Sequence, residues 1–160
     1  MAEITRKELI LLLIRSGEHP RLRNVDLSGL DLRGFHLQGA DLSQAELVES
    51  DLRQVNLREA NLERALLAQA DLRQADLRRA YCRGANFRLA SFAQALVKGA
   101  IFDHASFAGA NLEGVDLTGA SLVDADFTRS LLKGARLTAE QLASIHSLAG
   151  AILPDGTKND

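Results

Sequence analysis

The chain lacks several features that would assign it to a common class of protein. It has 160 residues, enough for one domain, and a single cysteine, so no disulfide bond can form within it. Lys and Arg number 19, against 21 Asp and Glu. The net charge of −2 argues neither for a nucleic-acid-binding protein nor for an acidic decoy, so the local distribution of charge has to decide.

A long hydrophobic run is also missing near the N-terminus. The run there, residues 9–14, has six residues and lies between Glu8 and Arg15. It is too short to span a bilayer, and it lacks the small-residue cleavage site of a secretory signal. We therefore expect a cytoplasmic protein with no membrane partner. The alternative is a targeting segment that was removed before residue 1.

Catalytic and metal-binding motifs are absent as well. The sequence contains no CxxC, HExxH or GxSxG motif and no P-loop of the form GxxxxGK[ST]. The four histidines have no metal-ligand spacing to one another: His19, His36, His104 and His146. We expect no enzymatic activity, no cofactor and no metal site.

The sequence does have a strict period of five. Residues 25–139 divide into 23 blocks of five, from VDLSG to ARLTA, without insertion or deletion. The first residue is Ala in 16 blocks, and the third is Leu in 16 and Phe in five. Asp or Asn, which favours turns, occupies the second position in 12 blocks, and Gly recurs at the fifth. One structural unit is therefore repeated along most of the chain.

This period is incompatible with one helix or one flat strand. Five residues turn an α-helix by about 500°, so the leucines would not form a stripe along it. In a strand, an odd spacing would place successive leucines on opposite faces. The chain must instead turn at every block, which directs each third-position side chain toward a common axis. The sequence therefore predicts a solenoid.

The blocks resemble a known family. ADLRQ at 70–74, ANLER at 60–64 and ANLEG at 110–114 have the form A(D/N)LXX and are similar to the repeats of pentapeptide-repeat proteins. The resemblance covers 115 of the 160 residues. It implies an all-β solenoid, the right-handed quadrilateral β-helix, with one block per side and about 20 residues per coil. The 23 blocks would make nearly six coils. At about 4.8 Å per coil the rod would be about 28 Å long.

The chain is expected to have three parts. These are an N-terminal cap at 1–24, the repeat β-helix at 25–139, and a C-terminal cap and tail at 140–160. Thr5 and Glu8 have the spacing of a capping box, which predicts a helix at 5–16. Its apolar residues are too many for a free surface helix, and we expect them to cover the open first coil.

A second helix is expected after the repeat. Thr138 and Gln141 form another capping-box pattern, and the helix would run over 139–148 and end at Gly150. A short helix followed by an LPDGT-like end is similar to the tails of cyanobacterial members of the family. Because both ends carry a cap, we expect a monomer.

Departures from the consensus predict features of the core. Ser50 and Ser130 occupy first positions, so their small hydroxyls are expected to be buried and bonded to the backbone. Cys82 occupies a third position and is expected to be buried as a small hydrophobe. Three phenylalanines fall on one side, a coil apart, and are expected to stack: Phe87, Phe107 and Phe127.

Cations recur at fourth positions, which point outward. In a four-sided register they form two neighbouring columns, Arg33, Arg53 and Arg73, then Arg58, Arg78 and Lys98. This basic strip would suit a phosphate-rich partner. The alternative is that Asp31, Asp51 and Asp71, two residues before the first three arginines, neutralise them in surface ladders of little energetic value.

Apolar residues intrude at other outward positions. Tyr81 and Ile101 belong to one side, a coil apart. Leu96 lies round the adjoining corner, and Leu89 is expected nearby in the same patch. A patch of this kind can mark a protein interface, and the alternative is a few isolated surface hydrophobes.

Three functional hypotheses follow. The first is a non-enzymatic protein-interaction or scaffold protein with an unknown protein partner, because a filled rod has flat walls and no pocket. The second follows from the resemblance, since some family members mimic a DNA duplex and bind DNA gyrase. The arginine columns disagree with such an acidic mimic. The third is binding of nucleic acid or another anionic partner by the basic strip. We favour the first and expect nucleic acid not to be the partner.

Overall fold

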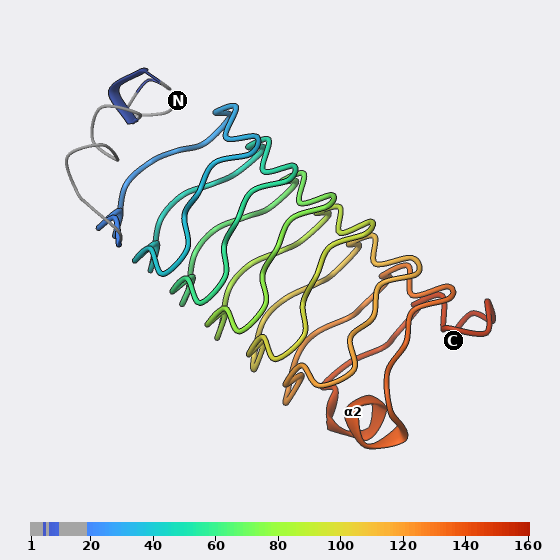
Figure 1. The fold of residues 1–160 in the computed structure, drawn as a ribbon. Helices are drawn as coiled ribbons and strands as arrows, with labels where there is room; N and C mark the ends of the chain where they lie inside the picture. Colours follow the sequence, from blue (N-terminus) through green and yellow to red (C-terminus); the bar gives the residue numbers. More distant parts are fainter. Residues whose placement is uncertain (1–4, 6, 10–18) are drawn as a thin grey trace.

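Backbone pairing repeats every 20 residues along the chain. The structure is a computed structural model, and it describes residues 5, 7–9 and 19–160. Arg21 forms a parallel bridge with Asp41, and Asp41 forms one with Asn61. Each bridge of this series joins the second residue of one block to the second residue of the block 20 residues later. The fourth and fifth residues of each block form a turn. The chain therefore winds into a β-helix of four blocks per coil, and the coils stack into a rod (Figure 1).

Each coil has four sides, which are defined by the residues at the second positions. Side 1 carries Arg21, Asp41, Asn61, Tyr81, Ile101 and Ser121. Side 2 carries Asp26, Glu46, Leu66, Asn86, Ser106 and Asp126. Side 3 carries Asp31, Asp51, Asp71, Ser91, Asn111 and Leu131. Side 4 carries His36, Asn56, Asp76, Leu96, Asp116 and Arg136. Turns 1 to 4 are the turns that follow sides 1 to 4 along the chain.

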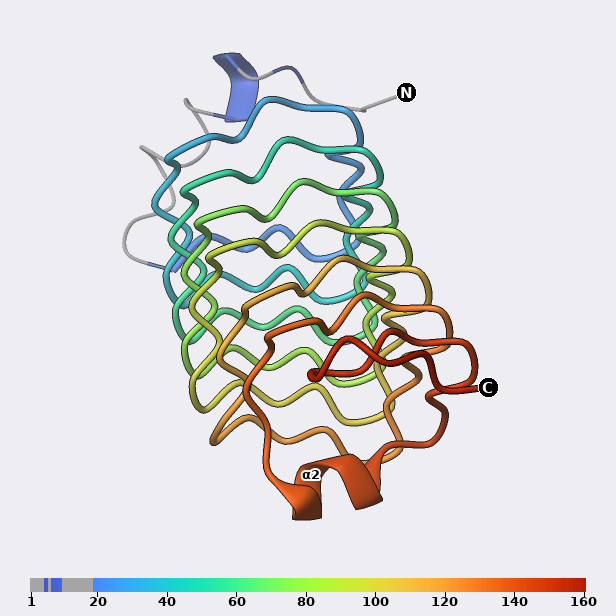
Figure 2. The same ribbon diagram turned by 90° about the vertical axis from the view of Figure 1, so that its right-hand side faces the viewer.

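Hydrogen bonds between coils hold this register. The Leu42 amide donates to the carbonyl oxygen of Asn61 in the next coil at 2.7 Å, and the Asp41 amide donates to that of Pro20 in the previous coil at 2.9 Å. The same pairs recur coil after coil, and Figure 2 shows the coils stacked above one another. Strands are thus reduced to single paired residues, because the chain turns again before a longer strand can form.

The turns explain the composition of the fifth position. The Ala45 amide donates to the carbonyl oxygen of Leu42 at 3.0 Å and closes one turn. The residue before Ala45, Gln44, has φ 58°, and Gly34 at the same position of an earlier turn has φ 67°. Because glycine adopts positive φ at no steric cost, it recurs there, as expected from the sequence.

First and third positions fill the interior. From Leu22 to Leu132 every third-position side chain is at most 1% exposed, including that of Cys82. Burial raises the pKa of the Cys82 thiol well above its ordinary value, as expected for a structural cysteine. The predicted phenylalanine stack is also present. The Phe107 ring lies 5.2 Å from that of Phe87 and 4.7 Å from that of Phe127, with 14° between the planes in both pairs.

The two core serines behave differently. The Ser50 hydroxyl donates to the carbonyl oxygen of Leu47 at 2.7 Å, which confirms the prediction for this residue. The Ser130 hydroxyl is buried and has no hydrogen-bond partner, so the prediction of a bond to the backbone is wrong there. One buried hydroxyl of the core is therefore unsatisfied.

The coil begins one block earlier than the five-residue pattern indicated. Arg21 already pairs with Asp41, Leu22 is fully buried, and Asn24 has the positive φ of a fifth residue, 59°. The block at 20–24, PRLRN, lacks the Ala and Gly that mark other blocks, which is why the pattern did not reveal it.

The described part of the N-terminal segment contains the predicted capping box. The Thr5 amide donates to Glu8 Oε2 at 2.8 Å, and the Glu8 amide donates to Thr5 Oγ1 at 3.2 Å. Residues 7–9 are helical, and Leu9 is buried within the core. The rest of the predicted helix at 5–16 lies outside the described residues, so its role as a cap stays a prediction.

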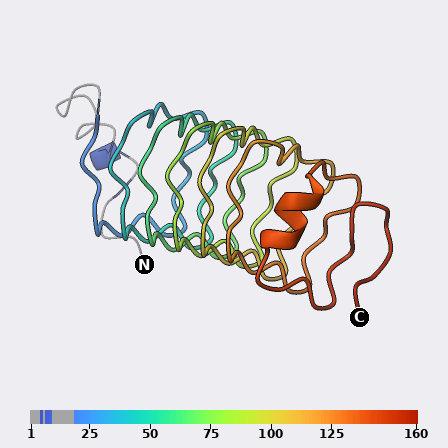
Figure 3. The ribbon, with the colours of Figure 1, turned by 90° about the horizontal axis from the view of Figure 1, so that it is seen from below.

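Helix α2, Ala139–Ser144, is shorter than the predicted helix at 139–148. It has no buried residue and lies alongside the last coils (Figure 3). After it the chain returns to the coil, because Ser147 pairs with Asp126 in a parallel bridge. Gly150, with φ 68°, is the fifth residue of that returning block and does not end the helix. Helix α2 therefore takes the place of the side-1 block in the last coil and lengthens that coil by one residue, since Ser147 lies 21 residues after Asp126.

A glutamine side chain joins α2 to the coil. The predicted capping box is present, since the Gln141 amide donates to Thr138 Oγ1 at 3.1 Å and the Thr138 amide to Gln141 Oε1 at 2.8 Å. Gln141 Nε2 donates in addition to the carbonyl oxygens of Leu117 and Ala120 at 2.7 and 2.8 Å. In earlier coils, the carbonyl oxygen at the position of Ala120 accepts a hydrogen bond from a backbone amide of the next coil. The side chain of Gln141 therefore replaces a coil-to-coil bond.

Before the coil that contacts α2, the coil-to-coil hydrogen bonds are interrupted at one place. Between residues 41 and 118, four amides at second, third or fifth positions donate to no neighbouring coil: Gln94, Val97, Gly99 and Asp116. One coil earlier, the amide that corresponds to Gly99 is that of Arg79, which donates to the carbonyl oxygen of Lys98 at 3.1 Å. This interruption, between residues 94–99 and 113–119, is called the seam below.

Candidate functional site

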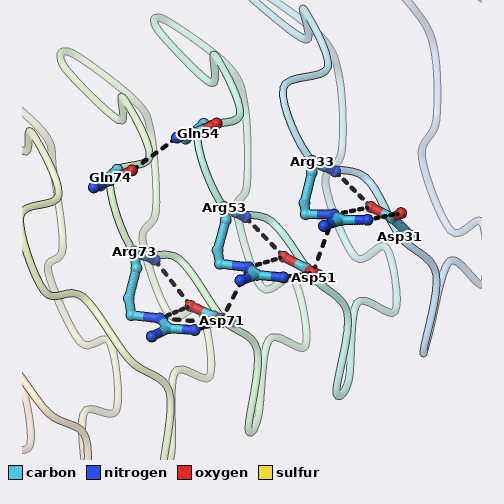
Figure 4. Close-up of polar contacts among 8 residues, drawn as sticks. All are labelled: Asp31, Arg33, Asp51, Arg53, Gln54, Asp71, Arg73 and Gln74. Atoms are coloured by element: carbon cyan, nitrogen blue, oxygen red, sulfur yellow. Dashed lines mark hydrogen bonds and ion pairs between the residues drawn. The ribbon is translucent and has the colours of Figure 1, made fainter.

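Turn 3 carries the first arginine column of the predicted basic strip, and each arginine there is paired (Figure 4). Arg33 donates from Nε and Nη2 to the two carboxylate oxygens of Asp31, at 2.9 and 2.7 Å. Arg53 does the same with Asp51 at 2.8 and 2.6 Å. In addition, Arg33 Nε lies 3.4 Å from Asp51 Oδ2 in the next coil. Aspartates and arginines thus alternate in a ladder across the coils.

The ladder is charge-balanced. It contains Asp31, Asp51 and Asp71 with Arg33, Arg53 and Arg73. Hydrogen bonds from Arg53 and Arg73 hold the pKa values of Asp51 and Asp71 below their ordinary value. A parallel ladder of amides lies beside it, in which Gln54 Nε2 donates to Gln74 Oε1 at 2.8 Å (Figure 4). This arrangement is the neutralised ladder that the sequence left open as the alternative to a basic strip.

Turn 4 carries the second cationic column, and only one of its three members is directly paired with a carboxylate. Arg78 pairs with Asp76 at 2.6 Å, in the manner of the turn-3 arginines. The corresponding side-4 residues before Arg58 and Lys98 are Asn56 and Leu96, which have no charge. Within the described part of the chain, neither Arg58 nor Lys98 has a carboxylate within 4.0 Å. Arg58 and Lys98 therefore have no directly paired carboxylate, and Asp76 and Asp116 of the next coil attract them only at longer range.

These cations line a shallow depression on the outer wall. It has a volume of about 370 Å³ and is called the turn-4 depression below. Its lining residues are Arg58, Arg78, Arg79, Lys98, Gly99 and Gly119. Arg79 adds a further cation, with Glu59 Oε1 at 3.7 Å from its Nη1. The depression adjoins the seam, because the Gly99 amide is one of the four without a coil-to-coil bond.

The structure brings together only part of the predicted apolar interface. Tyr81 and Ile101 are paired neighbours on side 1, and the Tyr81 side chain is 53% exposed. Leu96, 49% exposed, lies on side 4, across turn 4 from them. Leu89, 62% exposed, belongs to turn 2 and lies beside Gly109, so side 2 and turn 1 separate it from Tyr81. The prediction that Leu89 belongs to this patch is wrong, because residues that are close in the sequence can lie on different sides of the coil.

The turn-4 depression and the side-1 pair are adjacent. Arg79 lines the turn-4 depression and also a second one of about 500 Å³, whose lining includes Tyr81, His19 and Gly39. The missing direct partners of Arg58 and Lys98 could have been found in the sequence, from Asn56 and Leu96 at second positions of side 4. At the seam the sequence does depart from the consensus, because Val97 is the only valine at a third position of residues 25–139, but this departure does not by itself indicate an interrupted pairing.

No group of three or more His, Cys, Asp or Glu in the described ranges is placed to hold a metal ion. No helix among the residues that the structure describes is long and apolar enough to cross a membrane.

The period of 20 residues, the filled interior and the ladders on the walls define the protein as a four-sided β-solenoid built of five-residue blocks. The chain belongs to the pentapeptide-repeat family, because the model of that family, "Pentapeptide repeats", matches residues 21–58, 56–94 and 100–138. Proteins of this family form right-handed quadrilateral β-helices, and the solved structures that match the chain agree with this fold.

Several solved structures are similar to the chain. Trypsin-treated QnrB1, a plasmid-mediated fluoroquinolone resistance protein, is 21% identical with a TM-score of 0.58, and the match covers 83% of this chain and 81% of QnrB1. A pentapeptide repeat protein from Nostoc PCC 7120 is 31% identical with a TM-score of 0.40, over 72% of this chain and 93% of that one. HetL from the cyanobacterium Nostoc sp. strain PCC 7120, involved in heterocyst differentiation regulation, is 23% identical with a TM-score of 0.33, over 98% and 100%. A search of curated proteins found no match.

Proposed function

We propose that this protein is a non-enzymatic binding protein that presents the walls of a rigid β-helix to a protein partner. The observation that carries the proposal is the distribution of side chains between the interior and the walls. Third-position side chains from Leu22 to Leu132 occupy the interior, which leaves the outer surface for function. Catalysis generally uses titratable groups that converge in a concave site, and the turn-4 depression is shallow and lined by cations.

The wall around turn 4 is the part best suited to a protein partner. Tyr81 and Ile101 form a pair on side 1, and Leu96 lies across the turn on side 4. Exposed tyrosine supplies a large contact area at low entropic cost, and aromatic residues and arginines are enriched at protein interfaces. Here an exposed tyrosine lies beside Arg79. In the turn-3 ladder, by comparison, the charged side chains pair with one another. The ladder is charge-balanced, which gives no support to an acidic duplex mimic that binds gyrase.

The test is a capture experiment from an extract of the source organism, with the partner identified by mass spectrometry. The wild-type protein is compared with Tyr81→Asp/Ile101→Asp and with a control, Leu89→Asp, which changes a leucine on turn 2 that is more exposed than Tyr81. The side-1 variant is expected to lose a protein that the wild type and the control both retain. An identical set of captured proteins for all three would contradict the proposal.

A further inference from the structure

We propose that the turn-4 depression binds an oxyanion, a carboxylate or a phosphate, carried by an acidic segment of the protein partner. This inference rests on the proposed function, which it deepens by naming the chemistry of the contact. Its basis is a comparison between two neighbouring turns with the same repeated cations but different counter-charges.

Turn 3 shows how the fold neutralises an outward cation. Each arginine there has an aspartate two residues earlier, and the Arg53 guanidinium bonds both carboxylate oxygens of Asp51. At turn 4 the same register places Asn56 before Arg58 and Leu96 before Lys98. The protein thus provides two cations that lack the bidentate aspartate of the turn-3 pairs and that Asp76 and Asp116 of the next coil attract only at longer range. A carboxylate or phosphate from a partner would supply the missing half in the geometry that arginine favours.

Arg58 is already partly withdrawn from water. Its Nε is buried and has no hydrogen-bond partner. A guanidinium held in this way loses less rotamer freedom and less hydration when it pairs than a freely moving side chain does. Burial of Nε also leaves the charge of Arg58 less compensated by solvent, which favours an incoming anion at the exposed end of the guanidinium.

The backbone contributes a donor to the same depression. The Gly99 amide is released from the coil-to-coil pairing at the seam. Glycine lets a ligand approach the main chain closely, and free amides next to cations are a recurring arrangement for anions. The aliphatic part of Arg79 lies beside Gly99, where a Cβ would be 3.5 Å from Arg79 Cγ. The charged end of Arg79 is thereby kept near the same wall.

An acidic peptide segment suits the surroundings better than a nucleic acid. The cationic region is short, because the turn-3 column is neutralised and the carboxylates of Glu59 and Asp116 border turn 4. A nucleic acid strand carries phosphates in series and needs a longer cationic track. Tyr81 and Leu96 flank the depression on its two sides and offer contacts for apolar residues next to the acidic one.

The experiment uses the tyrosine of the chain as a reporter. Tyr81 is the only tyrosine and there is no tryptophan, so fluorescence excited near the tyrosine band reports on the wall beside Arg79. The probe is a short peptide of Glu and Leu without aromatic residues, and its Gln analogue is the neutral control. We expect a saturable change with the Glu peptide and none with the Gln peptide. Arg58→Gln/Lys98→Gln should weaken the affinity about tenfold or more, whereas Arg53→Gln in the ladder should leave it unchanged.

Competition identifies the source of the oxyanion. Displacement of the peptide by inorganic phosphate at lower concentration than by acetate would assign a phosphate group, and the reverse order a carboxylate, and either order supports the site.

Equal loss of affinity in Arg53→Gln and in Arg58→Gln/Lys98→Gln would overturn the proposal, because that result indicates general electrostatic attraction. Tighter binding of a single-stranded oligonucleotide than of the peptide would also overturn it. If the peptide fails to bind but Tyr81→Asp/Ile101→Asp still loses a captured protein, the oxyanion site is wrong and the proposed function stands.

Discussion

At the residue scale, the two serines of the core form a natural pair for comparison. Both occupy first positions and are at most 1% exposed, yet only Ser50 has a hydrogen-bond partner for its hydroxyl. An unsatisfied buried hydroxyl destabilises the folded state, whereas a satisfied one contributes about 1 kcal/mol. The same residue type at the same repeat position therefore has opposite effects on stability.

This difference predicts opposite mutational effects. Ser130→Ala should raise the free energy of unfolding by about 1 kcal/mol, since it removes a buried group without a partner. Ser50→Ala should lower it by a similar amount, about 1 kcal/mol, because it removes a bond to Leu47. Urea unfolding followed by circular dichroism measures both. Equal destabilisation by the two substitutions would show that the Ser130 hydroxyl does have a partner.

Individual residues also show which features of the candidate site can be predicted from the sequence. Whether an outward arginine is neutralised depends on the residue two positions earlier, and Asp51 before Arg53 or Asn56 before Arg58 can be read directly. The placement of Leu89 could not be obtained from distance along the chain, because turn positions and side positions face different directions. That the Ser130 hydroxyl lacks a hydrogen-bond partner could not be predicted from the sequence, since its block is otherwise regular.

At the element scale, the turn-3 ladder is the most regular polar structure of the rod. Two of its aspartates, Asp51 and Asp71, have folded-state pKa values below the ordinary value because of hydrogen bonds from Arg53 and Arg73. A carboxyl group of this kind contributes stability that is present above its unfolded pKa of about 3.9, and it loses that contribution as pH falls through the folded pKa.

The ladder therefore predicts a particular acid sensitivity. The free energy of unfolding should fall as pH decreases below about 4, and Asp51→Asn should make this fall shallower, because one titrating group with a lowered pKa is gone. Urea unfolding at a series of pH values between neutral and strongly acidic gives the slope. A slope below pH 4 that is the same in the variant would show that Asp51 is not stabilised by Arg53 in solution.

Helix α2 shows why an element boundary was misplaced. A glycine after a helical pattern usually indicates a C-terminal stop, but a glycine also suits the fifth position of a block. At Gly150 the second role holds, because Ser147 has already paired with Asp126. The capping box at Thr138 was predictable since it is local. The use of Gln141 to bond the coil was not, because it depends on where the helix lies.

The hydrogen bonds from the Gln141 side chain to the coil predict that Gln and Glu are not interchangeable in this capping box. Gln141→Glu keeps an acceptor for the Thr138 amide but removes the donors to the Leu117 and Ala120 carbonyl oxygens. We expect the free energy of unfolding to fall by about 2 kcal/mol. The neighbouring control, Glu140→Gln, should change it by only about 0.5 kcal/mol. Equal unfolding midpoints for Gln141→Glu and wild type would show that the side chain serves only the capping box.

At the scale of the whole molecule, the five-residue period determines most of the structure. Because the period admits neither a straight helix nor a flat strand, the solenoid and its filled interior follow from the sequence, and the observed burial agrees. The four-sided shape came from the family resemblance. The seam could not be predicted, because it depends on how neighbouring coils fit, although Val97, the only valine at a third position, departs from the consensus there.

The central claim is a rod whose coil-to-coil pairing, between residues 41 and 118, opens only at the seam beside the cationic wall of turn 4. Amide-resolved hydrogen exchange by NMR, with and without the Glu peptide, tests it most directly. The account predicts slow exchange at paired amides such as Leu77 and Arg79, fast exchange at Val97 and Gly99, and slower exchange of Gly99 when the peptide is bound. Equally slow exchange at Val97, Gly99 and their counterparts one coil earlier, or fast exchange throughout the coils, would contradict it.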